Sequence, residues 1–289
     1  MIATLNSNLT RLDYGPIQMN IQASCHGQPL IEYQRAAARA AMKLLDELAK
    51  CKHIAAQPQE KIGDISGLPS VLQKMVAAVR ESGDKTLTPM AAVAGSFADL
   101  VADYLVGRGA TKVIVNNGGD IAIRLLDNER VTVGLAPALG APFTHVKPIT
   151  AHDGIGGITT SGLGGRSFTK GIATAAVVAA ASAAFADACA TSLGNATYAP
   201  HPNIKRVLAE SIDPDTDIKG HYVVAQVGVL PPEIVEAALN NGWQKAQEWF
   251  NAGKIKGAAI FINNRGICIP DYFAQPAGHL QNEPEAARM

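Results

Sequence analysis

Apolar and polar positions change their spacing several times along the chain, and each spacing predicts a different element. Residues 10–24 contain alternating, β-favouring side chains, which predicts an opening strand or hairpin. Residues 32–50 repeat Ala and Leu at helical spacing, and Gly-Leu-Pro at 67–69 opens a second helix that is expected to reach about residue 81. Residues 89–106 begin with proline and consist largely of small residues, which predicts a third helix.

Short apolar runs bounded by turn residues dominate the middle of the chain and predict strands. These runs occupy residues 113–116, 121–126, 131–135, 155–162 and 172–180. Residues 137–153 contain three prolines and are expected to be irregular. The Ala-rich segment at 182–195 is expected to form a short helix with small side chains on nearly every face.

The C-terminal third has simpler patterns. A short helix is expected at 201–211, a strand at 222–230, a long helix at 231–250 and a closing hairpin at 256–269. The residues after 274 are rich in Pro, Gln and Glu, which is typical of a frayed tail. Because no linker interrupts the rest, the sequence predicts one domain over residues 1–274 and a tail over 275–289.

Composition and charge narrow the class of protein. Of the 289 residues, 47% are hydrophobic and 17% charged, which is typical of a compact globular protein. The 25 basic and 25 acidic residues give a net charge of +0, so no strong field attracts nucleic acid. The sequence shows no secretory signal and no apolar run suited to a bilayer, and its four cysteines lack zinc spacing. We therefore expect a cytoplasmic protein with reduced thiols and neither nucleic-acid nor membrane partners.

Gly95 lies inside the predicted helix at 89–106. A glycine there costs about 1 kcal/mol of helix stability relative to alanine. Its presence predicts that another backbone or a ligand approaches closely, and tight helix packing is the favoured explanation.

Asp187 and Thr191 are four residues apart in the segment at 182–195, so they share one face of the predicted helix. Two oxygen ligands among small side chains suit a hard cation such as Mg2+. Alternatively, the segment is a packing helix whose aspartate caps a neighbouring helix. Taken alone, the pattern favours this second interpretation.

Two glycine-rich segments add candidate ligand-binding backbone. Asn-Asn-Gly-Gly-Asp at 116–120 places hydrogen-bonding side chains on a turn that a ligand can approach closely. The loop at 159–171 offers backbone N–H groups near Arg166 and Lys170, which could hold a phosphate. Neither segment has the spacing of a P-loop or of the dinucleotide-binding fingerprint.

Three segments together, 116–120, Thr-Thr-Ser-Gly at 159–162 and Asp-Ala-Cys-Ala-Thr at 187–191, resemble the ApbE superfamily. Its founding members are Mg2+-dependent FAD:protein FMN transferases, and the resemblance covers roughly residues 86–195. It is closer still to a branch associated with sulfide assimilation and homocysteine formation in anaerobes. That branch has Pro-Met-Ala-Ala-Val-Ala-Gly, here at 89–95, and a Leu-Gly-Asn-like ending, here at 193–195.

The resemblance implies an α/β (α+β) fold with a T-fold-like core, in which helices pack on a mixed sheet. It also implies a site for FAD or a related flavin or adenine nucleotide together with Mg2+. The metal ligands would be Asp187, Thr191 and Thr159. The nucleotide-binding residues would be Asn116, Gly118, Gly119, Asp120, Thr160, Ser161, Gly162 and Arg166.

One segment of the flavin transferases is missing. They carry a His-His-Ile-Ile-Asp-Pro-like stretch between the Thr-Ser-Gly loop and the Asp-Thr helix, where residues 166–174 read Arg-Ser-Phe-Thr-Lys-Gly-Ile-Ala-Thr. Transfer of FMN to a hydroxyl needs a base, and that candidate is absent, so the sequence assigns no catalytic residue. Two alternatives follow: a sulfur-metabolism factor that uses a cysteine, with Cys189 inside a matched motif, or a non-catalytic, homo-oligomeric binding module.

Overall fold

The computed structural model describes residues 1–280, whose contacts group into two compact units. Unit 1 comprises Met1–Val131, Ile149–Thr159 and Ala179–Ala188, and unit 2 comprises Thr132–Pro148, Thr160–Val178 and the residues from 189 on. Five elements have residues in both units: β7 (Arg130–Leu135), β8 (His145–Thr150), β9 (Gly157–Ser161), β10 (Ala175–Ala180) and α5 (Ala183–Ala196). The expectation of a single domain over residues 1–274 stays a prediction.

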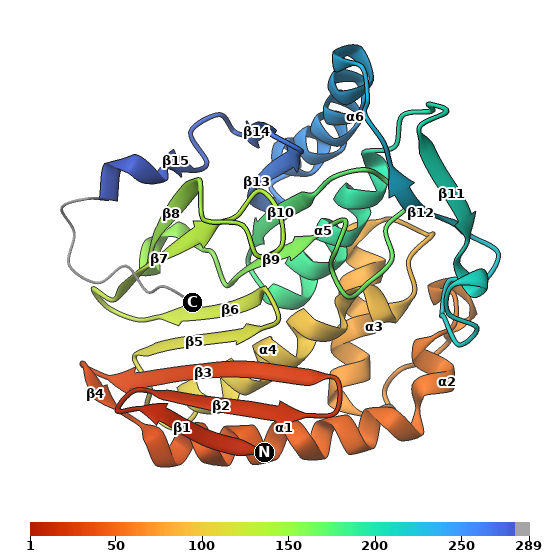
Figure 1. Ribbon diagram of the computed structural model, residues 1–289. Coiled ribbons are helices and arrows are strands. Elements are labelled where there is room, and N and C mark those ends of the chain that lie inside the picture. Colours follow the sequence, from red (N-terminus) through yellow and green to blue (C-terminus); the bar gives the residue numbers. More distant parts are fainter. Residues whose placement is uncertain (281–289) are drawn as a thin grey trace. The chain divides into compact units, whose positions relative to one another are not determined.

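Antiparallel strands form the sheet of unit 1. They are β1 (Ile2–Asn6), β2 (Leu9–Tyr14), β3 (Ile17–Cys25), β5 (Lys112–Asn117) and β6 (Asp120–Leu125), with the short β4 (Gln28–Pro29) beside β3. Figure 1 shows them side by side in the order β1-β2-β3-β5-β6, and β9 follows β6. β2 and β3 form the hairpin predicted for residues 10–24, and β1 is an additional strand.

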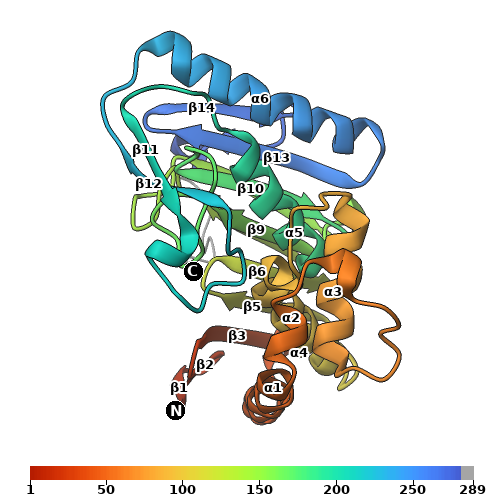
Figure 2. The same cartoon turned by 90° about the vertical axis from the view of Figure 1, so that its right-hand side faces the viewer.

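Helices cover one face of this sheet (Figure 2). They are α1 (Ile31–Lys50), α2 (Lys52–Ala55), α3 (Ser70–Ser82) and α4 (Val93–Val106), with the 3-10 turns η1 (Gln59–Lys61) and η2 (Pro89–Ala92). Unit 1 also contains the 3-10 turn η3 (Ala151–Asp153), which follows β8. α1 packs on β2 and β3, and α4 packs on β5 and β6. The three long helices confirm the predicted ones, except that the third begins as the 3-10 turn η2.

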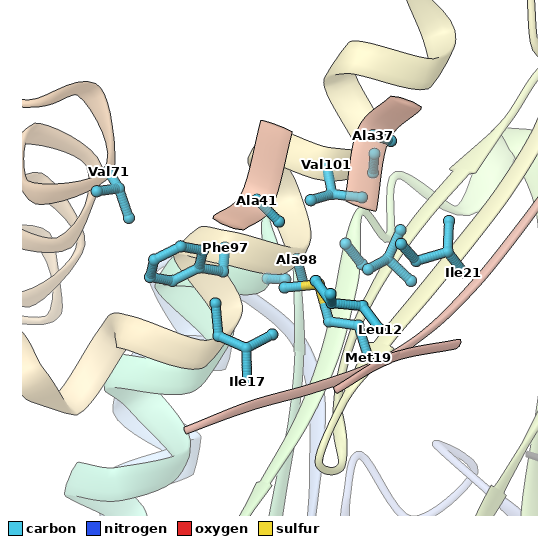
Figure 3. Packing of buried hydrophobic residues seen from close by; sticks show 14 of the residues in the cluster. Leu12, Ile17, Met19, Ile21, Ala37, Ala41, Val71, Phe97, Ala98 and Val101 are labelled. Atoms are coloured by element: carbon cyan, nitrogen blue, oxygen red, sulfur yellow. The ribbon is translucent and has the colours of Figure 1, made fainter. Parts of the chain in front are cut away.

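The core of unit 1 lies between these helices and the sheet (Figure 3). Alternate residues of β3 face it, among them Met19 and Ile21, whereas Gln18 is exposed and Asn20 half-buried. Small residues of α1 and α4, such as Ala37, Ala41 and Ala98, are fully buried opposite them. Small side chains let these helices lie close to the strands.

The helical stretch Pro89–Val106 is long and apolar enough to cross a membrane by length and composition alone. In the structure 56% of it is buried, and α4 packs against β5, β6, α1 and α3. These contacts are those of a core helix.

In its described part, up to residue 280, unit 2 contains three groups of strands and one long helix. Besides most of β7 and β8, its elements are β11 (Ile204–Leu208), η4 (Ala209–Ser211), β12 (Tyr222–Val227), α6 (Pro232–Asn251), β13 (Ile255–Ile262), β14 (Arg265–Ile269), β15 (Gln275–Pro276) and η5 (Ala277–Leu280). β10, β13 and β14 are neighbours in one sheet, β11 pairs with β12, and β8 lies between β7 and β15. The strand at 222–230, the helix at 231–250 and the closing hairpin are confirmed.

Two local predictions were wrong. Residues 201–211 form β11 and η4 instead of a helix, because Ile204 and Val207 pair with Val227 and Val223 of β12. The spacing of Ile204 and Val207 also fits a helix, and pairing with β12 selects the strand. Residues 145–150 form β8 within the segment expected to be irregular, because Val146 and Ile149 are buried although Pro148 interrupts the pattern.

The predicted fold class, an α+β fold of sheet and packed helices, is confirmed by these layers. Paired backbone continues past residue 274, since Gln275 and Pro276 pair with Val146 and His145 of β8. The remainder of the expected tail, residues 281–289, lies outside the described residues.

Candidate functional site

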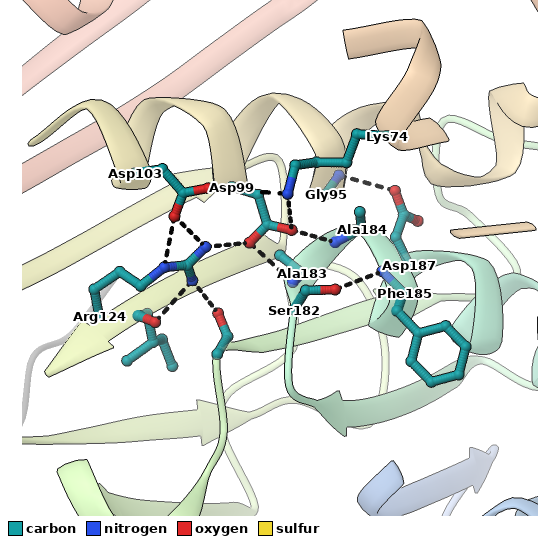
Figure 4. A network of polar contacts seen from close by, with 12 residues as sticks. Lys74, Gly95, Asp99, Asp103, Arg124, Ser182, Ala183, Ala184, Phe185 and Asp187 are labelled. Atoms are coloured by element: carbon teal, nitrogen blue, oxygen red, sulfur yellow. Dashed lines mark hydrogen bonds and ion pairs between the residues drawn. The ribbon is translucent and has the colours of Figure 1, made fainter. Parts of the chain in front are cut away.

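Asp187 is in the first turns of α5 and reaches the start of α4. Its Oδ2 atom accepts a hydrogen bond of 2.9 Å from the backbone N–H of Gly95 (Figure 4). The residue that precedes α4, Ala92, has no side-chain acceptor to cap the helix. Asp187 therefore caps α4 from a neighbouring helix, as the packing interpretation of the sequence predicted.

A second carboxylate makes the reciprocal contact. Asp99, on α4, is fully buried and accepts hydrogen bonds from the first amides of α5: Ala183 N at 3.1 Å and Ala184 N at 2.9 Å. Each helix thus supplies the acidic cap of the other. On each helix the capped amide and the capping aspartate are four residues apart: Gly95 and Asp99 on α4, Ala183 and Asp187 on α5. The amides at a helix start lack partners within their own helix, so these contacts satisfy groups that would otherwise be buried unpaired.

Gly95 permits this close approach. A Cβ atom built on it would lie 2.2 Å from the carbonyl oxygen of Ala183, closer than any real contact. The sequence-based prediction that Gly95 allows tight helix packing is confirmed.

Two cations compensate the acidic pair on α4. Arg124 Nη2 lies 2.8 Å from Asp99 and 2.7 Å from Asp103, and Lys74 Nζ lies 3.8 and 3.9 Å from the same carboxylates. Burial would lower the pKa of Arg124, but Asp99 and Asp103 raise it, so the guanidinium stays charged. Arg124 also donates to the carbonyl of Gly156, the residue directly before β9, and so connects β6 to the start of β9.

The Asn-Asn-Gly-Gly-Asp turn joins β5 to β6 and contacts the start of α4. Gly118 and Gly119 have φ angles of 71° and 109°, which other residues rarely adopt. Asn116 Oδ1 accepts from Gly119 N at 2.9 Å, and Asn117 Nδ2 donates to the carbonyl of Ala94 at 3.2 Å. The side chain of Asn117 therefore fastens this turn to the start of α4, beside the amide that binds Asp187.

Asp120 begins β6 and is the second acidic residue near Asp187. Residues 120, 122 and 124 share a face of β6, and Arg124 contacts α4 from that face, so Asp120 lies on the helix-covered side. Burial raises the pKa of Asp187 well above its usual range, and the charge of Asp120 raises it further. Amide hydrogen bonds from Gly95 and Ala94 act in the opposite direction. A buried carboxylate under the influence of a second, half-buried one favours a bound proton or cation.

Thr159 is in β9, the strand next to β6. Ile121 pairs with Ile158 and Ala122 with Gly157, so the same register extended by one residue places Thr159 opposite Asp120. Its side chain is fully buried, and within the described residues its hydroxyl has no hydrogen-bond partner. Gly157, two residues before Thr159 in β9, packs directly against Ala183 of α5. A Cβ atom on Gly157 would be 2.3 Å from the Cα atom of Ala183.

The remaining predicted residues belong to unit 2. Thr160 and Arg166 are exposed, whereas Ser161 and Thr191 are half-buried. Gly162 has a φ of 152° and packs against the carbonyls of Ala173 and Thr174. Within this unit the loop contacts the Leu-Gly-Asn ending, because Lys170 N donates to Asn195 Oδ1 at 2.8 Å.

Sequence reasoning missed Asp99, Asp103 and Arg124. The available signal was a pair of carboxylates one helical turn apart in an otherwise apolar segment, which implies a buried cationic partner. Nothing in the spacing identified Arg124 as that partner, since 21 positions separate it from Asp103.

Cysteines and histidines contribute little to this site. All four cysteines lie in the described part of the chain and none forms a disulfide; Cys189 is buried. Burial, followed by the charge of Asp271, raises the pKa of Cys268, which disfavours its thiolate. Burial and the charge of Lys170 lower the pKa of His221, which favours its neutral ring.

The raised pKa of Asp187 predicts a pH-dependent stability in the absence of divalent cations. The pKa of Asp187 in the folded protein lies above its value of about 4 in the unfolded chain. The free energy of unfolding therefore decreases as the pH rises from about 4 to the folded-state pKa. Asp187→Asn keeps a carbonyl-type acceptor but carries no charge, so this loss should be absent. Urea unfolding in chelator between about pH 4 and pH 8 measures it, and parallel profiles of the two proteins would contradict the assignment.

Comparison with known proteins places the chain in a family. The family model described as AbpE bacteria matches residues 2–270. A protein of Methanothermobacter thermautotrophicus named "UPF0280 protein" is 33% identical over 215 residues, which cover 71% of this chain and 81% of the relative. A second "UPF0280 protein", of Methanococcoides burtonii, is 36% identical over 160 residues that cover 55% of this chain and 65% of that relative.

Solved structures of flavin transferases are more distant. The apo form of the flavinyl transferase ApbE of Pseudomonas stutzeri is 14% identical, with a TM-score of 0.49 over 92% of this chain and 95% of that one. The flavin transferase ApbE of Vibrio cholerae is 13% identical, with a TM-score of 0.43 over 64% of this chain and 85% of that one. The family model and the first relative, which extend over most of the sequence, establish that this chain belongs to the AbpE bacteria family of the ApbE-like superfamily.

Proposed function

We propose that this protein is an ApbE-like enzyme that binds a flavin or adenine nucleotide with Mg2+ and transfers a phosphoryl or FMN-type group. Family membership supports a flavin-related transfer function. The observation that carries the metal proposal is the buried carboxylate of Asp187 beside that of Asp120. The negative charges of the two carboxylates repel each other, and a divalent cation bound by Asp187 would relieve that repulsion.

The residues of unit 1 fit Mg2+ chemically. Mg2+ prefers oxygen ligands and often uses one or two carboxylates. Asp187 offers a carboxylate, and the buried hydroxyl of Thr159 offers a further oxygen on the strand next to Asp120. When bound, Mg2+ would stabilise charge that develops on a transferred phosphate. Asp187 would thus serve as both a helix cap and a metal ligand.

The turn at 116–120 would hold the nucleotide. The left-handed glycines Gly118 and Gly119 leave the backbone open to close approach, and Asn117 fixes the turn against α4. Asn116 would orient the turn through its bond to Gly119 N. The predicted residues of unit 2, namely Thr160, Ser161, Gly162, Arg166 and Thr191, remain proposals that rest on the resemblance.

Calorimetric titration tests this function directly. Purified protein is titrated with FAD, FMN, ADP and ATP, each with and without Mg2+. Saturable binding that requires Mg2+ supports the proposal, and the acceptor of the transferred group can then be sought. Absence of binding to all four nucleotides overturns it.

Thr159→Val should weaken Mg2+-dependent binding without loss of stability. Valine has the shape of threonine but no oxygen, so the site loses one ligand while a buried hydroxyl without a partner is removed. Thr10→Val is the matched control, because Thr10 is equally buried in β2 and its hydroxyl likewise has no partner within the described residues. Equal titration curves for the two variants would exclude Thr159 as a ligand.

The cysteine-based alternative has less support. Cys189 is fully buried in α5, and the pKa of Cys268 is raised by burial, so neither has the environment of a reactive thiolate. Persulfide formation detected by mass spectrometry after treatment with polysulfide, which supplies sulfane sulfur to a thiolate and leaves as a shorter polysulfide, would reinstate the sulfur-metabolism proposal. A pocket that lacks both a bound metal and an accessible base would favour the non-catalytic binding module.

A further inference from the structure

We propose that Asp99 is a positioning residue for the cation site: it holds the first turn of α5 so that the carboxylate of Asp187 faces the cation, without touching the cation itself. This inference rests on the proposed function, because it assigns a purpose to the helix contacts around Asp187. All of its components lie in unit 1.

The carboxylate of Asp99 is fully engaged. Its Oδ1 atom accepts from Ala183 N and from Arg124 Nη2, and its Oδ2 atom accepts from Ala184 N and lies 3.8 Å from Lys74 Nζ (Figure 4). The side chain is completely inaccessible to solvent. A buried carboxylate with four partners has one orientation, so the start of α5 has a fixed place relative to α4.

Asp187 follows Ala183 by one turn of α5, a rise of about 6 Å. At that level the helix is tied a second time, by the bond from Gly95 N to Asp187 Oδ2. The two contacts, Asp99 with Ala183 and Gly95 with Asp187, lie at opposite ends of one turn on both helices. Because a metal ligand must be held within fractions of an ångström, a rotation of α5 that releases the first contact would displace Asp187.

Asp103 supplies a matched control. It contacts the same two cations as Asp99, at 2.7 Å from Arg124 and 3.9 Å from Lys74. Its side chain is 49% exposed, and the described structure shows no bond from it to an α5 amide. Replacing either aspartate by asparagine removes one negative charge from this cluster, but only Asp99→Asn disturbs the start of α5, since an amide cannot accept from all four donors.

The experiment measures Mn2+ binding to the full-length protein, with Mn2+ as a spectroscopic substitute for Mg2+. We expect Asp99→Asn to weaken Mn2+ affinity about tenfold and Asp103→Asn by less than about twofold. At saturation, water-proton relaxation should be faster in Asp99→Asn, because a displaced Asp187 leaves a coordination position to water. A general loss of stability would lower the amount of folded protein but would not change the relaxation of bound Mn2+. Equal affinity and relaxation for the two variants overturn the inference.

Amide hydrogen exchange without cation separates this inference from the proposed function. In Asp99→Asn the amides of Ala183 and Gly95 should exchange at least about tenfold faster, and in Asp103→Asn they should be unchanged. If wild-type protein binds no Mn2+, the proposed function fails, and unchanged exchange at Gly95 overturns the positioning role independently. Should Asp99→Asn not fold, Arg124→Lys replaces it, with smaller changes in the same direction expected and their absence counting against the inference.

Discussion

Asp187→Asn should abolish Mg2+-dependent nucleotide binding while the protein remains folded. The substitution keeps an oxygen that can accept the hydrogen bond from Gly95 N, so α4 retains its cap. It removes the carboxylate charge that a hard cation requires. Because even residues that only orient a metal ligand contribute 10–100-fold to affinity, losing the ligand should cost at least about 100-fold. Calorimetric titration with Mg2+ and FAD measures this.

Asp187→Ala separates the two roles of this side chain. It should lose the cation as Asp187→Asn does, and in addition lose about 1 kcal/mol of stability with the helix cap. Thermal unfolding of both variants in chelator measures the difference. Retained binding in Asp187→Asn would show that Asp187 is only a cap, and the metal proposal would then fail.

Gly95→Ala should destabilise the protein by about 3 kcal/mol, at the upper end of the usual cost of overpacking. The added Cβ atom would lie 2.2 Å from Ala183 O and 2.9 Å from Ala184 N, and backbone cannot move aside as a side chain can. The helix would have to shift, which also breaks the bond from Gly95 N to Asp187. Alanine's better helix propensity, worth about 1 kcal/mol, recovers only part of the loss.

Gly242→Ala is the matched control. Gly242 is inside α6 and gains the same helix propensity, but its added Cβ atom meets the end of a flexible side chain, Ile260 Cδ1, at 2.6 Å. We expect this variant to stay within about 1 kcal/mol of wild type. Urea unfolding of both proteins checks the pair, and similar effects would show that the close contact at Gly95 relaxes easily.

Much of the local structure was predictable from spacing and turn residues. The helices α1, α3 and α6 and the hairpin β5–β6 match their predicted ranges within a few residues, because periodic apolar positions and terminal Pro and Gly residues act locally. β11 was mistaken for a helix because Ile204 and Val207 satisfy both spacings, and only pairing with β12 distinguishes them.

The candidate site was predictable as a set of motifs but not as an arrangement. Gly95 predicted a close contact between helices, and the motifs at 116–120 and 187–191 indicated a ligand site. The sequence could not show that Asn117, Gly95 and Asp187 converge at the start of α4. It also left open whether Asp187 caps a helix or binds a cation, and the structure shows the cap and places a second carboxylate, Asp120, near it.

The sequence by itself thus determined most of the helices and strands, the need for a small residue at position 95 and the chemical types available for a cation or phosphate. Only the tertiary structure decided which charges meet: Asp99 with the first amides of α5 and with Arg124, and Asp187 with Gly95. The physical reason is the range of the interactions. Helix propensity and turn geometry depend on residues a few positions apart, whereas burial, charge pairing and capping between helices depend on contacts across more than 80 positions of the chain, as between Ala184 and Asp99.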